Sequence, residues 1–161
     1  MKLLFICTHN RCRSILCEAI TNHLAKGKIT AYSAGSQPVG EVHPLSIKYL
    51  RSQGISTEGL QSQSWDDFEQ VDPDVVITVC DSAANEVCPV WFGDCTRVHW
   101  GLPDPSINVG SEEEVQAAFY SLMDSIQNRI EQTLTLDLNN KNELKTTLDN
   151  IAKGDEKDGI I

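Results

Sequence analysis

Four short runs of Ile, Val, Leu and Phe recur along the chain, separated by longer segments with helical spacing of apolar residues. The runs predict strands over residues 3–6, 29–32, 74–79 and 96–100. The other segments predict helices over residues 14–25, 44–52, 65–70, 111–132 and 140–152. Strands that are apolar on both faces belong inside a parallel sheet covered by helices. The pattern therefore predicts a small doubly wound α/β domain with a four-stranded parallel sheet, whose ligands bind beyond the carboxyl ends of the strands.

The length and charge of the chain narrow the class of protein. The chain has 161 residues, and 13 basic residues against 23 acidic residues give a net charge of −10. This length suits one globular domain. An acidic surface disfavours general binding to nucleic acid or to an anionic membrane, so we expect neither as a partner.

The N-terminal residues indicate in which cellular compartment the protein is expected. The opening apolar run turns polar at Thr8, which is too early for the apolar core of a signal peptide. No apolar run approaches the length of a transmembrane helix. We therefore expect a cytoplasmic protein with its cysteines reduced at rest.

Reduced cysteines in such a protein serve metal binding or redox chemistry. The six cysteines are Cys7, Cys12, Cys17, Cys80, Cys88 and Cys95. The gaps between them are 5, 5, 63, 8 and 7 positions, and the four histidines are not paired at ligand spacing. Structural zinc sites usually contain a short knuckle of two cysteines, so we expect no zinc.

The segment from Cys7 to Ser14 carries the strongest signal for chemistry. It follows the first predicted strand and leads into a helix, an arrangement that directs backbone N–H groups and a helix dipole at an anion. Arg13 can bind a tetrahedral oxyanion with both arms of its guanidinium, and Cys7 can attack it as a thiolate of lowered pKa. The five residues that would wrap this oxyanion are Thr8, His9, Asn10, Arg11 and Cys12. Alternatively, Cys7 is a small buried hydrophobe and Arg13 a surface cation.

Asp104 follows the fourth predicted strand and should therefore reach the same edge of the sheet as Cys7. Pro103 and Pro105 stiffen its loop, so Asp104 can serve as a general acid that protonates a leaving oxygen. An isolated Asp-Pro pair is more often just a turn.

Cys80 ends the strongest predicted strand at that edge. Neighbouring strands lie about 4.8 Å apart, which is within the Cα separation that a disulfide tolerates, so Cys80 can lie within reach of Cys7. The alternative is that Cys80 and Cys88 are ordinary buried thiols.

These residues resemble the low-molecular-weight tyrosine phosphatase family, and in particular its arsenate reductase branch. The resemblance covers about residues 2–130 and rests on Cys7–Ser14, Tyr32–Gly35, the strand into Cys80, His99–Gly101 and Asp104-Pro105. It implies a flavodoxin-like fold with flanking helices and a catalytic domain over residues 1–134. Residues 135–161 are then a C-terminal extension, a helix plus a flexible tail, and not a separate domain. The implied catalytic residues are Cys7, Arg13, Ser14, Cys80, Cys88 and Asp104.

The resemblance also implies a mechanism. Reduction of arsenate needs two electrons, which thiols supply by becoming a disulfide. Cys7 attacks arsenate, Arg13 holds the oxyanion and Asp104 helps water to leave. Cys80 then attacks the Cys7 sulfur and releases arsenite, and Cys88 takes over the disulfide. Thioredoxin or a glutathione and glutaredoxin system would reduce it, with no bound cofactor, and phosphate or sulfate would compete with arsenate.

Some positions depart from the family pattern. Seven residues separate Cys80 from Cys88, one more than in the thioredoxin-coupled members, so the electron donor stays open. Some members bind potassium through residues matching Asn10, Glu18 and Ser33, but their completing aspartate is Gln63 here, so we expect no metal.

Two alternatives to a reductase remain. One is a low-molecular-weight protein tyrosine phosphatase that hydrolyses phosphate monoesters, and the other is a non-enzymatic thiol redox sensor. Ser106-Ile107 replaces the tyrosines that commonly line a phosphotyrosine cleft, and Arg11 replaces an apolar loop residue. A small, strongly anionic substrate therefore fits better. Cys12, Cys17 and Cys95 are interpreted as mainly structural.

Overall fold

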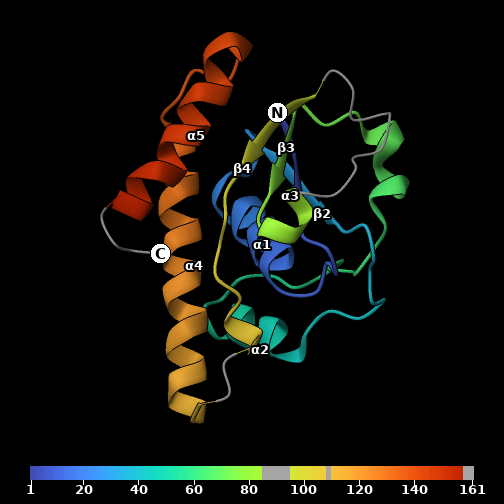
Figure 1. Ribbon diagram of the computed structural model, residues 1–161, viewed down its shortest axis with the longest axis vertical. Coiled ribbons are helices and arrows are strands. Elements are labelled where there is room, and N and C mark those ends of the chain that lie inside the picture. The colour runs from blue at the N-terminus through green and yellow to red at the C-terminus, as the bar shows by residue number, and fades with distance from the viewer. Residues whose placement is uncertain (85–94, 108–109, 158–161) are drawn as a thin grey trace.

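A four-stranded parallel sheet lies at the centre of the molecule in the computed structural model, which describes residues 1–84, 95–107 and 110–157 (Figure 1). Its strands are β1 (Lys2–Ile6), β2 (Thr30–Ala34), β3 (Val75–Thr78) and β4 (Thr96–His99). The order across the sheet is β2-β1-β3-β4. This is the doubly wound arrangement that the alternating pattern predicted.

Helices follow the strands in the expected order. The α-helices are α1 (Arg13–Leu24), α2 (Pro44–Ser52), α3 (Asp81–Ala84), α4 (Glu112–Leu134) and α5 (Lys141–Lys157). In the part of the chain that the structure describes, short 3-10 helices span Trp65–Val71 and Pro105–Ile107. Helix α1 packs against β1, β2 and α4, and α5 packs against β4 and α4. Figure 1 shows α4 and α5 side by side at one flank of the sheet.

Strand β1 lies in the interior of the sheet, and its apolar sequence suits this position. Leu3, Leu4, Phe5 and Ile6 of β1 are all buried, because the strand has a neighbour on each side and covered faces above and below. Strand β1 pairs with β2 and β3 in parallel, so the carboxyl ends of all three strands meet at one edge.

The helix termini follow capping rules. The Ser111 hydroxyl accepts a hydrogen bond from the backbone N–H of Glu114 at 3.2 Å, at the start of α4. Three glutamates in the first turn of α4 complement its dipole. Pro44 stands in the first turn of α2, where a missing N–H costs nothing.

Two boundaries differ from the predicted ones. Strand β2 continues through Ser33 and Ala34, because these residues pair with Phe5 and Ile6 of β1. Helix α5 runs from Lys141 to Lys157, five residues beyond the predicted end at residue 152. Packing of the preceding turn stabilises this end of α5, which sequence composition alone does not reveal.

Helix α5 is joined to the sheet through Trp100, which follows β4. The indole is fully buried, packs against Phe5 at 6.2 Å between ring centroids, and donates a hydrogen bond to the carbonyl oxygen of Leu148 at 3.0 Å. Leu144, Leu148 and Ile151 on α5 are also buried. Among the described helices, none is both long enough and apolar enough to span a bilayer.

Candidate active site

The carboxyl ends of β1, β3 and β4 bring the predicted site residues to one cavity. Register places Ile6 opposite Thr78, and Thr78 opposite His99, so the segments that follow these strands emerge next to one another. The cavity has a volume of about 380 Å³. Its lining residues are Cys7, Thr8, His9, Arg11, Cys12, Arg13, Cys80, Asp104, Ser106 and Ile107.

Asn10 and Ser14 do not line this cavity but support the loop from behind. Both side chains are buried, and the Asn10 amide nitrogen donates to Ser14 Oγ at 2.8 Å. The Asn10 amide oxygen accepts from the backbone N–H of Gln63 at 2.8 Å. Asn10 also has a φ of 47°, in the left-handed region that asparagine tolerates better than most residues. These bonds fix the curvature of the loop.

Gly35, at the end of β2, lets the loop approach the sheet closely. A Cβ atom at this position would collide with the carbonyl oxygens of Cys7 and Thr8. The loop therefore lies directly against the backbone of β2, and Gln37 extends this contact by donating its N–H to Thr8 O at 2.9 Å.

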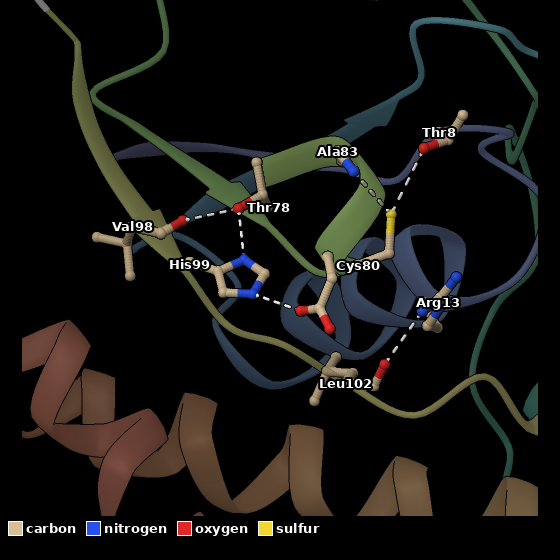
Figure 2. A network of polar contacts seen from close by, with 9 residues as sticks. Thr8, Arg13, Thr78, Cys80, Ala83, Val98, His99 and Leu102 are labelled. Carbon is tan, nitrogen blue, oxygen red and sulfur yellow. Dashed lines mark hydrogen bonds and ion pairs between the residues drawn. The ribbon is translucent and has the colours of Figure 1, made fainter. Parts of the chain in front are cut away.

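Arg13 connects the loop to the segment that carries Asp104. Its Nη1 donates to Leu102 O at 3.1 Å, and its Nη2 lies 3.7 Å from Asp104 Oδ2 (Figure 2 shows the bond to Leu102). Within the described part of the chain, the buried Arg13 Nε has no hydrogen-bond partner. This guanidinium therefore has a donor to offer an oxyanion in the cavity.

Asp104 is held by its own loop. One carboxylate oxygen, Oδ1, accepts from the backbone N–H of Ser106 at 2.9 Å and from the Ser106 hydroxyl at 2.6 Å. The other oxygen, Oδ2, faces Arg13. The acid thus lies at the cavity with a defined orientation, as its position after β4 predicted.

Cys7 and Cys80 form a hydrogen-bonded pair of buried thiols at the floor of this site. Cys80 Sγ also accepts from the backbone N–H of Ala83 at 3.4 Å and lies 3.7 Å from Thr8 Oγ1, as Figure 2 shows. The hydrogen bond from Cys7 lowers the pKa of Cys80, and the Thr8 and Ala83 donors add to this effect.

The same hydrogen bond raises the pKa of Cys7, and burial raises it further, while Arg13 opposes both effects. The loop does act as predicted, since the Arg13 charge and the backbone N–H of His9 both lower the pKa of Cys7, but Cys80 and burial outweigh them here. Because Cys80 accepts hydrogen bonds from more donors than Cys7 does, the thiolate form is favoured more at Cys80 than at Cys7.

The remaining cysteines differ in their surroundings. Cys12 lines the cavity, and burial raises its pKa to about 11. Cys17 is fully buried in α1, and burial raises its pKa too. Cys95 is half-buried and donates to Pro73 O at 3.3 Å. Cys88 lies outside the described residues.

The residues that match the potassium ligands of some family members are hydrogen-bonded to other groups of the protein. The Ser33 hydroxyl donates to Glu18 Oε1 at 2.8 Å, and the Asn10 amide oxygen is occupied by the N–H of Gln63. Burial raises the pKa of Glu18 to about 7, so its carboxylate is only partly charged at neutral pH. Over residues 1–84, 95–107 and 110–157, no group of three or more His, Cys, Asp or Glu is arranged to hold a metal. The absence of a metal stays a prediction.

Sequence reasoning missed two groups of polar contacts. One is the pair of bonds from Ser106 to Asp104, and the other links Asp81 to His99 beside Cys80. The register of β3 and β4, together with the position of Asp81 directly after Cys80, is the signal that could have found the second group.

Comparisons with known proteins agree on one family. The model of the family described as low molecular weight phosphotyrosine protein phosphatase matches residues 2–147. The chain is 34% identical to an arsenate reductase of Bacillus subtilis over 128 residues, which are 80% of this chain and 91% of the relative. It is 32% identical to a glutaredoxin arsenate reductase of Synechocystis sp. over 133 residues, which are 83% of this chain and 95% of the relative. The solved thioredoxin-dependent arsenate reductase of Corynebacterium glutamicum has a TM-score of 0.62 and 27% identity, covering 83% of this chain and 60% of that one.

Proposed function

The chain belongs to the low molecular weight phosphotyrosine protein phosphatase family, and we propose that it acts as an arsenate reductase that draws electrons from its own thiols. The observation that carries this proposal is the hydrogen-bonded pair of Cys7 and Cys80 in the cavity that also contains Arg13. Hydrolysis of a phosphate ester needs one thiolate, whereas reduction of arsenate needs two sulfurs that end as a disulfide.

In the first step, Cys7 forms a bond to arsenic and one arsenate oxygen leaves as water. The proton of the Cys7 thiol passes along the existing hydrogen bond to the Cys80 thiolate, which leaves the charge on Cys7 beside Arg13. Arg13 and the backbone N–H groups of the loop hold the remaining arsenate oxygens. Asp104 supplies the proton that the departing oxygen needs.

In the second step, the Cys80 sulfur attacks the Cys7 sulfur. A disulfide bond forms, the sulfur–arsenic bond breaks, and its electron pair goes to arsenic, which is reduced from arsenate to arsenite. The proton that Cys80 received passes to an oxygen of the departing arsenite, so that Cys80 attacks as a thiolate. Cys88, in the role that the family resemblance implies, then attacks Cys80 and restores the Cys7 thiol.

An external thiol reductant completes the cycle, because the protein ends each turnover with a disulfide. The Synechocystis relative is named for glutaredoxin and the Corynebacterium structure for thioredoxin, so we propose one of these two protein classes as the donor. Arsenate is the substrate, and phosphate and sulfate compete for the same loop because both are tetrahedral oxyanions.

Arsenate-dependent oxidation of NADPH tests this function, measured separately with thioredoxin and its reductase and with glutathione, glutaredoxin and glutathione reductase. A reductase consumes NADPH in proportion to arsenate with at least one system. A phosphatase hydrolyses an aryl phosphate without any reductant, and a thiol sensor turns over neither substrate. Hydrolysis without arsenate-dependent NADPH consumption would contradict the proposal.

A further inference from the structure

A polar network surrounds the first turn after Cys80, on the side of β3 and β4. We propose that Asp81 and His99 are positioning residues that hold the Cys80 sulfur where it can attack Cys7. This inference rests on the proposed function, since only reduction uses the second sulfur. Asp81 and His99 are proposed in addition to the catalytic residues, and they contact neither arsenate nor the reacting sulfurs.

The network joins three segments at the edge of the sheet. His99 Nε2 lies 2.9 Å from Asp81 Oδ1, and His99 Nδ1 lies 2.8 Å from Thr78 Oγ1. Thr78 Oγ1 is also 3.5 Å from Val98 O. Figure 2 shows the imidazole of His99 between Thr78 and the start of α3. Both ring nitrogens are thus engaged, and the ring has a defined orientation.

The described part of helix α3, Asp81–Ala84, begins directly after Cys80, so the placement of its first residue affects the direction of the Cys80 side chain. The backbone before it is fixed by hydrogen bonds from Val79 N to Ile6 O and from Leu102 N to Val79 O, both 2.9 Å. The bond from His99 to Asp81 extends this attachment from the sheet to the first residue of the turn.

The contacts of the Cys80 sulfur itself are hydrogen bonds to sulfur, which is a weak acceptor. Sγ lies 3.4 Å from Ala83 N and 3.7 Å from Thr8 Oγ1. A rotation of α3 would change the direction from this sulfur to Cys7 without breaking a strong bond. Attack on sulfur depends on close and aligned approach, so the orientation of the turn controls the rate of the second step.

Gly101 supplies an independent observation. A Cβ atom at this position would lie 3.1 Å from His99 Nε2 and 3.3 Å from Asp81 Oδ1. These separations are tighter than ordinary contacts, so the missing side chain leaves room for the hydrogen bond between His99 and Asp81. Gly101→Ala therefore disturbs the pair while leaving both partners in place.

Asp81 and His99 lie at the surface, where their interaction contributes little to the stability of the folded protein. The Asp81 side chain is 89% exposed and the His99 side chain 41% exposed. Exposed ion pairs stabilise proteins only weakly. We therefore expect loss of this pair to lower the rate of arsenite release while the protein stays folded.

The test compares two activities in the same variants. Reduced protein is mixed with excess arsenate and no reductant, and the rate of arsenite release in a single turnover is measured. Hydrolysis of p-nitrophenyl phosphate is measured in parallel, because it needs Cys7, Arg13 and Asp104 but not Cys80. Asp81→Ala, His99→Ala and Gly101→Ala disrupt the pair, and Asp81→Asn keeps an acceptor for His99. Asp149→Asn is the control, because it removes an ion pair of the same 2.9 Å length on α5.

We expect the three disruptive variants to release arsenite roughly fivefold or more slowly, with hydrolysis within about twofold of the unmodified protein. Asp81→Asn recovers part of the rate, and Asp149→Asn has no effect. Unchanged arsenite release in the disruptive variants, or equal losses in both activities, would overturn the positioning role. If the unmodified protein hydrolyses the ester but releases no arsenite, the proposed function itself fails.

Discussion

Arg13 has a role in the site that depends on the shape of its side chain. Its guanidinium reaches Leu102 O and Asp104 while keeping a buried Nε that has no partner in the described part of the chain. A lysine provides one charged nitrogen and cannot make these contacts together. The arginine therefore orients both the oxyanion and the acid loop.

Arg13→Lys is expected to lower kcat/KM for arsenate reduction and for aryl phosphate hydrolysis by at least about tenfold, which is about 1.4 kcal/mol of transition-state stabilisation. Steady-state kinetics of both reactions measures this effect. Near-normal kinetics would mean that the loop amides alone hold the anion.

Cys80→Ser is expected to separate the two reactions. A serine hydroxyl cannot form the disulfide, so arsenate reduction over many turnovers should stop. Hydrolysis of p-nitrophenyl phosphate should persist, because it uses Cys7, and Cys7→Ser is the matched variant that should lose both activities. An equal loss of both activities in Cys80→Ser would assign Cys80 a structural role.

Glu18 should make the stability of the protein depend on pH. Burial raises its pKa from 4.5 to about 7, so the folded chain holds this proton more tightly than the unfolded chain does. The contribution of Glu18 to stability therefore falls as pH rises from about 4.5 through about 7. Glu18→Gln keeps an oxygen that can accept the bond from Ser33 and removes the buried charge.

We expect Glu18→Gln to raise the free energy of unfolding by roughly 1–3 kcal/mol at about pH 8 and to change it little at about pH 5. Urea unfolding of both proteins at the two pH values measures the difference. A gain of equal size at both pH values would show that the charge of Glu18 is not the cause.

Helix α5 illustrates how an element beyond the catalytic motifs can still belong to the core. Trp100 donates to Leu148 O from the residue after β4, and Arg13 donates to Leu102 O two residues further on. The extension therefore contacts the segment that leads to Asp104. We propose that residues 135–161 belong to the same domain as the sheet.

Leu148→Ala is expected to lower the free energy of unfolding by roughly 2–4 kcal/mol, because this fully buried side chain would leave a cavity beside Trp100. Asp149→Asn, at the next position of the same helix, should change stability by less than about 0.5 kcal/mol. Urea unfolding monitored by circular dichroism gives both values. Equal, small effects of the two substitutions would indicate that α5 is only loosely attached.

The whole molecule combines a net charge of −10 with a cationic site. Arg11 and Arg13 line the cavity, while Glu112, Glu113 and Glu114 lie in the first turn of α4. The local field of the loop therefore favours an oxyanion at this cavity in a chain whose net charge is negative.

If the sheet and its extension form one domain, the chain should unfold in a single cooperative transition. Tryptophan fluorescence and far-ultraviolet circular dichroism should report the same urea midpoint within error, since the buried Trp100 lies where α5 meets the sheet. Two separate midpoints would show that the extension unfolds independently.

Local patterns were sufficient to predict most of the architecture. The succession of strands and helices along the chain and the parallel sheet were predicted and are confirmed, because hydrophobic periodicity and turn residues act within short stretches of chain. The family was predicted from the resemblance of its motifs and is confirmed too. The loop after β1 and the position of Asp104 were also predictable, since both follow from where strands end.

The directions of the loop side chains and the protonation of Cys7 and Cys80 could not be predicted from local sequence patterns. Asn10 and Ser14 belong to the predicted loop and motif but turn away from the cavity, because their partners are each other and the distant Gln63. The lowered pKa of Cys80 depends on donors from Cys7 and Thr8, in the loop after β1, and from Ala83 in α3. The bond from Asp81 to His99 and the continuation of α5 likewise depend on contacts between residues far apart in sequence, and only folding brings such residues together.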